Sequence, residues 1–126
     1  SAQTILAAID VRSPVATGRA LIALTNWTIA KADIDSGDSE AASRADLFSI
    51  AALAAACDLG KDCSVDSYDA QLQCVMVGAC DGWMFNLPDK TMSARDWQII
   101  QKYKRGIVEA VFNRNLDSLP AMLRAQ

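Results

Sequence analysis

The sequence contains no histidine and only two glutamates, Glu40 and Glu109, among its 126 residues. Without an imidazole, a Ser-His-Asp or Cys-His catalytic arrangement cannot form, and the commonest metal ligand is missing. Aspartates are plentiful, but no spacing singles out two of them as the carboxylate pair of a glycosidase. We therefore expect a non-enzyme with no catalytic residue, no metal and no cofactor. The first alternative is an enzyme that acts on cell-wall glycan through aspartates.

An excess of basic residues and a long apolar run are also missing. The net charge is −3, and the one short basic cluster is Lys102, Lys104 and Arg105, which is a poor footprint for nucleic acid. No stretch approaches the roughly 18 apolar residues that span a bilayer. The partner we expect is therefore another protein, with no nucleic acid and no membrane span. Because the chain begins Ser1-Ala2-Gln3, without Met or a charged leader region, we expect a signal peptide to have been removed.

Aromatic residues make up only 6% of the chain, although hydrophobic residues make up 52% and many of these are alanine. Such a composition favours closely packed helices, and no stretch shows strand-like alternation or a hairpin turn. We predict an all-α fold in a single helical domain, 1–126, built as a compact bundle or irregular array of about five to six helices. The expected helices cover residues 4–11, 14–32, 43–59, 67–77, 93–113 and 119–124.

Several helix ends carry recognisable capping residues. Ser13-Pro14 reads as an N-cap followed by the first helical position, where proline has no N–H to lose. Ser43–Asp46 and Ser93–Asp96 each resemble a capping box with Asp in the place of Glu. Gly60 suits the position just after a helix because it tolerates a positive φ. The apolar stripe of residues 93–113 is the most sustained, so we expect this helix to be the longest well-defined element.

Four cysteines form two matched segments. Five residues separate Cys57 from Cys63, and five separate Cys74 from Cys80, with a glycine inside each segment. A glycine turn can bring the two cysteines of a segment together, so we predict the disulfides Cys57–Cys63 and Cys74–Cys80. Pairing across the segments, a Cys₄ zinc site and free thiols in the cytoplasm remain alternatives, although structural zinc sites prefer tighter spacings. Two disulfides indicate a periplasmic or secreted protein.

The acidic stretch Asp33–Asp38 invites a calcium interpretation. An EF-hand loop needs glycine at position six and glutamate at position twelve. Counted from Asp33, these positions hold Asp38 and Arg44. We therefore favour a solvated polar loop, and cation binding at Asp33–Asp38 stays open.

A short apolar stretch follows Cys80 and carries the residues that we expect to bind a partner. Its large side chains are Trp83, Met84, Phe85 and Leu87. Aromatic residues and methionine are enriched in protein interfaces. The alternative is that these side chains cover one end of the helical core.

The run Ala51–Cys63, followed by Cys74, Cys80 and the amphipathic stretch Trp97–Val111, resembles a type of uncharacterised exported helical protein of Gram-negative bacteria. Its alanine-rich run that ends at a glycine is also similar to Sel1-like helical repeats, but no full repeat is present. Neither resemblance implies a catalytic residue. We expect an exported protein-binding module, in one version an immunity or inhibitor protein against a secreted bacterial effector. A secreted effector or a structural envelope protein is the second alternative.

Overall fold

Six α-helices account for most of the chain that the computed structural model describes, which is residues 1–35, 37–64, 67–77 and 92–124. No strand occurs within these ranges, so the predicted all-α class is confirmed. The helices are α1 (Ala2–Asp10), α2 (Pro14–Ala32), α3 (Ser39–Asp58), α4 (Tyr68–Val77), α5 (Ala94–Phe112) and α6 (Ser118–Arg124).

The predicted cap of α2 is confirmed. Ser13 Oγ accepts a hydrogen bond from the Ala16 N–H at 3.4 Å, and Pro14 is the first helical residue. The helix ends at Asp33, which adopts a left-handed φ of 53°. Aspartate tolerates this conformation better than most residues, so the first acidic side chain of the 33–38 loop serves as a helix stop.

The predicted start of α3 is wrong. We expected Ser43 to cap this helix, but Asp38 does so, and α3 begins at Ser39. Asp38 Oδ1 accepts hydrogen bonds from the N–H groups of Glu40 at 3.0 Å and Ala41 at 3.3 Å. The extended backbone of Asp38 lets it cap the chain one turn earlier, which leaves Ser43 inside the helix. With 20 residues, α3 is also longer than the 19-residue α5, so the prediction that residues 93–113 form the longest element is wrong as well.

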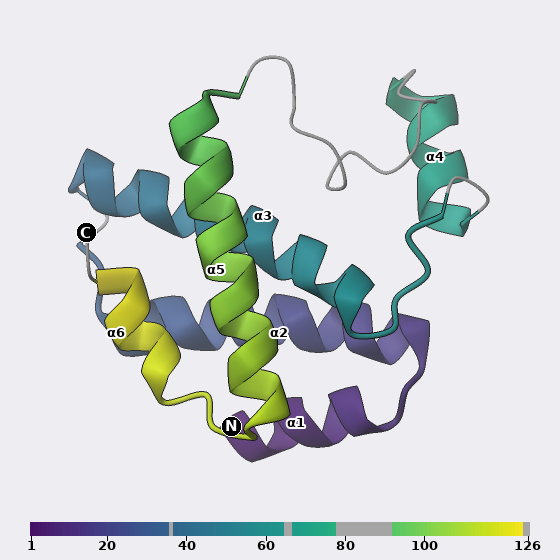
Figure 1. The fold of residues 1–126 in the computed structure, drawn as a ribbon, viewed down its shortest axis with the longest axis horizontal. Coiled ribbons are helices and arrows are strands. Elements are labelled where there is room, and N and C mark those ends of the chain that lie inside the picture. The colour runs from purple at the N-terminus through teal and green to yellow at the C-terminus, as the bar shows by residue number, and fades with distance from the viewer. Residues whose placement is uncertain (36, 65–66, 78–91, 125–126) are drawn as a thin grey trace.

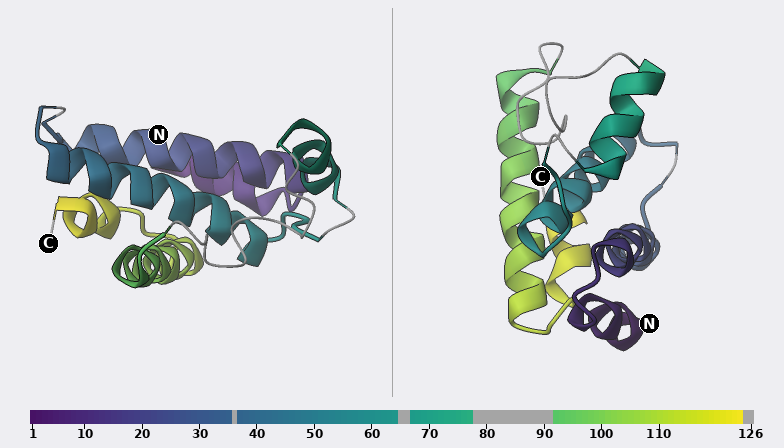
Figure 2. Two further views of the ribbon diagram at one scale, coloured as in Figure 1. Left: turned by 90° about the horizontal axis from the view of Figure 1, so that it is seen from above. Right: turned by 90° about the vertical axis from the view of Figure 1, so that its right-hand side faces the viewer.

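The α3 helix lies between α2 on one side and α5 on the other, as the two views in Figure 2 and the ribbon in Figure 1 show. Alanines fill most of its core face, and because their side chains are short, both neighbouring helices can approach the α3 backbone closely. Phe48 is the large exception, and its ring packs against that of Tyr103 with 5.6 Å between centroids. The buried alanines of this helix are Ala41, Ala51, Ala52, Ala54, Ala55 and Ala56.

A disulfide and a glycine turn close the far end of α3. Gly60 has a φ of 116°, and the Lys61 N–H donates to the Ala56 carbonyl at 2.9 Å, as in a Schellman motif. This turn brings Cys57 and Cys63 together, with 5.6 Å between their Cα atoms, and their predicted disulfide is confirmed. Because both sulfurs are in the disulfide, the alternative of a Cys₄ zinc site is excluded for this pair.

The second predicted disulfide involves a residue outside the described ranges. Cys74 lies on α4 and is not a free thiol, but Cys80 falls in the segment 78–91. Between described residues the structure gives one disulfide, Cys57–Cys63, and the pairing Cys74–Cys80 stays a prediction.

The last two helices close the core from the front in Figure 1. Ser93 caps α5 as predicted, since its Oγ accepts from the Asp96 N–H at 3.0 Å. α6 then turns back over α5 and contacts α2 and α3. Gly106 makes the close approach to α6 possible, because a Cβ there would lie 2.6 Å from the Met122 sulfur.

Candidate functional site

The four predicted partner-binding residues, Trp83, Met84, Phe85 and Leu87, lie outside the described residues. The helix that precedes them in the sequence, α4, is described. Their role therefore stays a prediction.

The apolar side chains of α4 face solvent. Leu72, Val75 and Met76 are 42%, 82% and 73% exposed. Among the described residues, α4 makes no extensive contact with another helix, whereas the other five pack together. Figures 1 and 2 show it standing apart at one end of the molecule. These three residues lie at helical spacing, and nothing in that spacing indicates that no other described helix packs against them.

A shallow groove lies beside the connection to α4. Val15 and Ile22 from α2 and Leu53 from α3 give it apolar walls, and its volume is about 460 Å³. Val15 and Ile22 are both largely exposed. The Lys61 side chain crosses α2 at Gly18, where a Cβ would lie 3.7 Å from its Nζ. Ser67, the residue just before α4, also lines the groove, so the groove and α4 are neighbours. We call the groove, together with the exposed residues Leu72, Val75 and Met76 of α4, the α2–α4 surface.

The acidic loop uses its carboxylates to hold the backbone. Asp35 Oδ1 accepts from the Gly37 N–H at 2.9 Å, and Asp38 caps α3. Within the described ranges, no group of three or more acidic or cysteine residues could hold a metal ion. These roles favour the polar-loop interpretation of Asp33–Asp38 over the calcium one.

Other aspartates have structural partners as well. Asp10 pairs with Arg114 at 2.8 Å, and this hydrogen-bonded ion pair lowers the pKa of the Asp10 carboxyl. Asp62 accepts from the Ser64 hydroxyl at 2.7 Å, which lowers the pKa of Asp62. Asp58 pairs with Lys104 at 3.4 Å. A lowered pKa keeps a carboxyl ionised at neutral pH, which is unsuited to a general acid.

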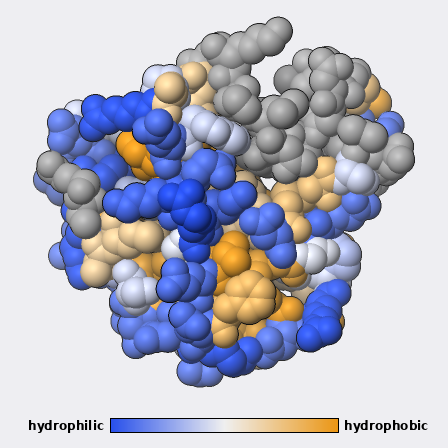
Figure 3. Space-filling view, in the orientation of Figure 1, coloured by the Kyte–Doolittle hydropathy of each residue, from blue (hydrophilic) through white to orange (hydrophobic). Residues whose placement is uncertain are grey.

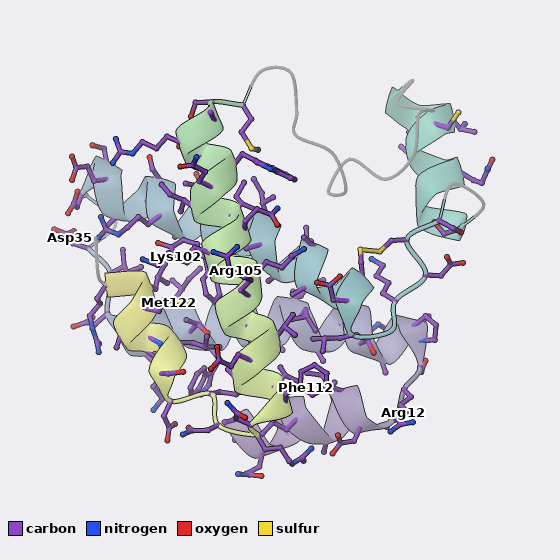
Figure 4. The ribbon with its side chains drawn as sticks, viewed as in Figure 1. Arg12, Asp35, Lys102, Arg105, Phe112 and Met122 are labelled. Carbon is purple, nitrogen blue, oxygen red and sulfur yellow. A yellow bond between two sulfur atoms is a disulfide. The ribbon has the colours of Figure 1, made fainter. Side chains whose placement is uncertain are left out.

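The face of the molecule seen in Figure 3 is mostly hydrophilic, and its most strongly apolar atoms lie beside α5. A wider area lies along the C-terminal half of α5, where Phe112 is 75% exposed and is labelled in Figure 4. A smaller one lies among hydrophilic atoms beside the N-terminal half of α5. Phe112 is the last residue of α5 and lies away from α4, so it provides a comparison site for the α2–α4 surface.

The fold and these surfaces define a helical domain with a disulfide and exposed apolar residues on a separate helix. None of the helices in the described ranges is long and apolar enough to cross a membrane. Comparison with protein families, with curated proteins and with solved structures finds no match to this chain.

Proposed function

We propose that this protein is an exported protein-binding module that presents α4 to an apolar surface of another protein. The observation that carries this proposal is the exposure of Val75 and Met76 on a helix that packs against no other described helix. A helix of 10 residues is marginal in water by itself and gains stability when its apolar side chains are covered. Insertion of an amphipathic helix into a partner's groove is a common mode of protein recognition.

The predicted contact residues extend the same surface along the sequence. Trp83 follows the last residue of α4, Val77, by six positions. A partner that covers α4 can therefore reach this aromatic stretch without a second binding site. Truncation of a tryptophan at the centre of an interface typically costs about 2 kcal/mol or more of binding energy.

Export is supported by the Cys57–Cys63 disulfide, since disulfides persist mainly in oxidising compartments. We place the protein in the periplasm or outside the cell, and the specific role we favour is that of an immunity or inhibitor protein. Such a protein acts by covering its target and needs no catalytic group. The roles of the aspartates in caps and ion pairs support binding over the glycan-acting alternative.

The experiment compares charged substitutions at two equally exposed apolar sites. A partner is first cross-linked to the protein in a cell-envelope extract and identified, and its Kd is then measured. Val75→Asp and Met76→Asp should each raise the Kd at least tenfold, because binding would bury an unpaired charge. Phe112→Asp is the control, since Phe112 is as exposed as Met76 but lies far from α4.

Melting temperatures separate binding from folding. Val75→Asp, Met76→Asp and Trp83→Ala should leave the melting temperature nearly unchanged while they weaken the complex. Equal binding by the α4 variants and the unmodified chain would contradict the proposal. Turnover of peptidoglycan that a single Asp→Asn change abolishes would favour the enzyme instead.

A further inference from the structure

A second hollow lies where the N-terminal half of α5 crosses the first half of α3, and nothing in the proposed function uses it. Its volume is about 410 Å³, which is within the usual range of small-molecule sites. Leu47 and Ile99 give it an apolar part, and Arg44, Lys102 and Tyr103 give it polar groups. We call this site the α3–α5 hollow. Lys102 extends from α5 on the side of this hollow in Figure 4, and Figure 3 shows apolar atoms within hydrophilic surroundings there.

Tyr103 is the unusual group of the hollow. The residue is only 3% exposed, its ring packs against Phe48, and yet it lines the hollow. Its hydroxyl makes no hydrogen bond with the described part of the chain, and its oxygen is not closed off from solvent, so it is open to a ligand in the hollow. Burial raises the pKa of the Tyr103 phenol, and the charge of Arg44 partly offsets this rise. The phenol is therefore protonated at neutral pH and can donate a hydrogen bond.

Arg44 offers matching donors from the opposite wall. Its Nε donates to the Leu123 carbonyl at 3.2 Å, which fixes the guanidinium against α6. Its two Nη atoms form no hydrogen bond or ion pair with any described residue. A partly buried guanidinium held by one nitrogen, with its other N–H groups unused, is suited to bind a planar carboxylate. Arg44 on α3 and Tyr103 on α5 both line the hollow, so one ligand can meet both groups.

The charges around the hollow limit which anion it can take. Lys102 and Arg95 add two cations that form no ion pair within the described ranges, while Glu40 and Asp96 add two carboxylates. With Arg44, the hollow carries three positive and two negative side chains. This small positive excess favours a singly charged anion over a phosphate dianion, which the two carboxylates would repel.

We infer that the α3–α5 hollow binds a carboxylate attached to an apolar group. The carboxylate would accept hydrogen bonds from Tyr103 and Arg44, and the apolar group would cover Leu47 and Ile99. Such a group occurs in a free apolar acid and at the C-terminus of a peptide that ends in an apolar residue. The site is separate from the α2–α4 surface, so the inference does not depend on the proposed function.

Calorimetric titration with matched probes tests the inference. N-acetyl-leucine carries the carboxylate, N-acetyl-leucinamide lacks it, and a tetrapeptide ending in leucine carries it at a chain end. We expect saturable binding of at least one of the two acids, and at least tenfold weaker binding of the amide. If the tetrapeptide binds more tightly than N-acetyl-leucine, the natural ligand is the C-terminus of a peptide chain. If the two bind equally well, the natural ligand is a small acid.

Three variants assign the binding to this hollow. Tyr103→Phe keeps the ring and Arg44→Gln keeps a planar polar group, and each should weaken binding of the acid by about tenfold or more. Arg105→Gln removes one positive charge from α5 outside the hollow and should leave binding unchanged. Circular dichroism melts check that each variant folds. If the melts show that Arg44→Gln loosens α6, the assignment rests on Tyr103→Phe alone.

Four results would overturn the inference. They are the absence of saturable binding by both acids, equal binding of acid and amide, full binding by the folded Tyr103→Phe variant, and binding of inorganic phosphate in place of the acids.

Discussion

Two glycines inside helices should respond to the same substitution by different amounts. Gly18 in α2 and Gly106 in α5 are both interior helical residues, where alanine is favoured over glycine by about 0.5–1 kcal/mol. At Gly18 a Cβ would lie 3.7 Å from Lys61 Nζ, which is ordinary van der Waals contact. We therefore expect Gly18→Ala to raise the free energy of unfolding by nearly this full amount.

At Gly106 the same methyl group meets α6. Its Cβ would lie 2.6 Å from the Met122 sulfur and 2.9 Å from the Met122 Cε, so the methionine must move. These atoms are the far end of a flexible, half-buried side chain, so a change of rotamer relieves the contact at a small cost. This cost offsets part of the gain in helix propensity, and Gly106→Ala should stabilise the protein by less than Gly18→Ala does. In a Met122→Ala background, the substitution should stabilise by the full amount, like Gly18→Ala.

Urea denaturation of the four variants, with a double-mutant cycle for Gly106 and Met122, measures these effects. For 126 residues, an unfolding entropy of roughly 2.1 cal/mol/K per residue converts 0.5–1 kcal/mol into a rise of about 2–4 °C in melting temperature for Gly18→Ala. If Gly106→Ala stabilises as much as Gly18→Ala, α6 does not pack against α5 as described. If Gly18→Ala destabilises, the Lys61 side chain is held more tightly on α2 than its contact distance implies.

Two further predictions concern the disulfide and a buried hydroxyl. Replacing Cys57 and Cys63 together by alanine should lower the free energy of unfolding by about 2 kcal/mol, which is the loop-closure entropy expected for a sequence separation of six residues. Urea denaturation measures this loss, and a loss near zero would contradict the prediction. Thr17→Val should raise the free energy of unfolding by about 1 kcal/mol, because the fully buried Thr17 Oγ1 meets no hydrogen-bond partner in the described part of the chain. Thr28→Val is its control and should not stabilise, since Thr28 Oγ1 donates to the Leu24 carbonyl at 2.8 Å; equal effects at both sites would refute the argument.

Local chemistry in the sequence determined most of the helix ends. Ser13-Pro14, Gly60 and Ser93 act within a few residues of themselves, so their roles are independent of the rest of the fold. The same is true of Cys57–Cys63, which the Gly60 turn brings together. At the start of α3, local reasoning selected Ser43 and missed Asp38, because an aspartate and a serine can accept the same kind of hydrogen bond.

Only the tertiary structure decided which surfaces are covered. On α3, the face that carries Phe48 and Ala51 is buried because α2 and α5 pack on it. On α4, Val75 remains in solvent, since no other described helix packs there. The α3–α5 hollow joins Arg44 and Tyr103 from helices far apart in the sequence. A helical period fixes which residues share a face, but the partner of that face depends on how distant segments pack.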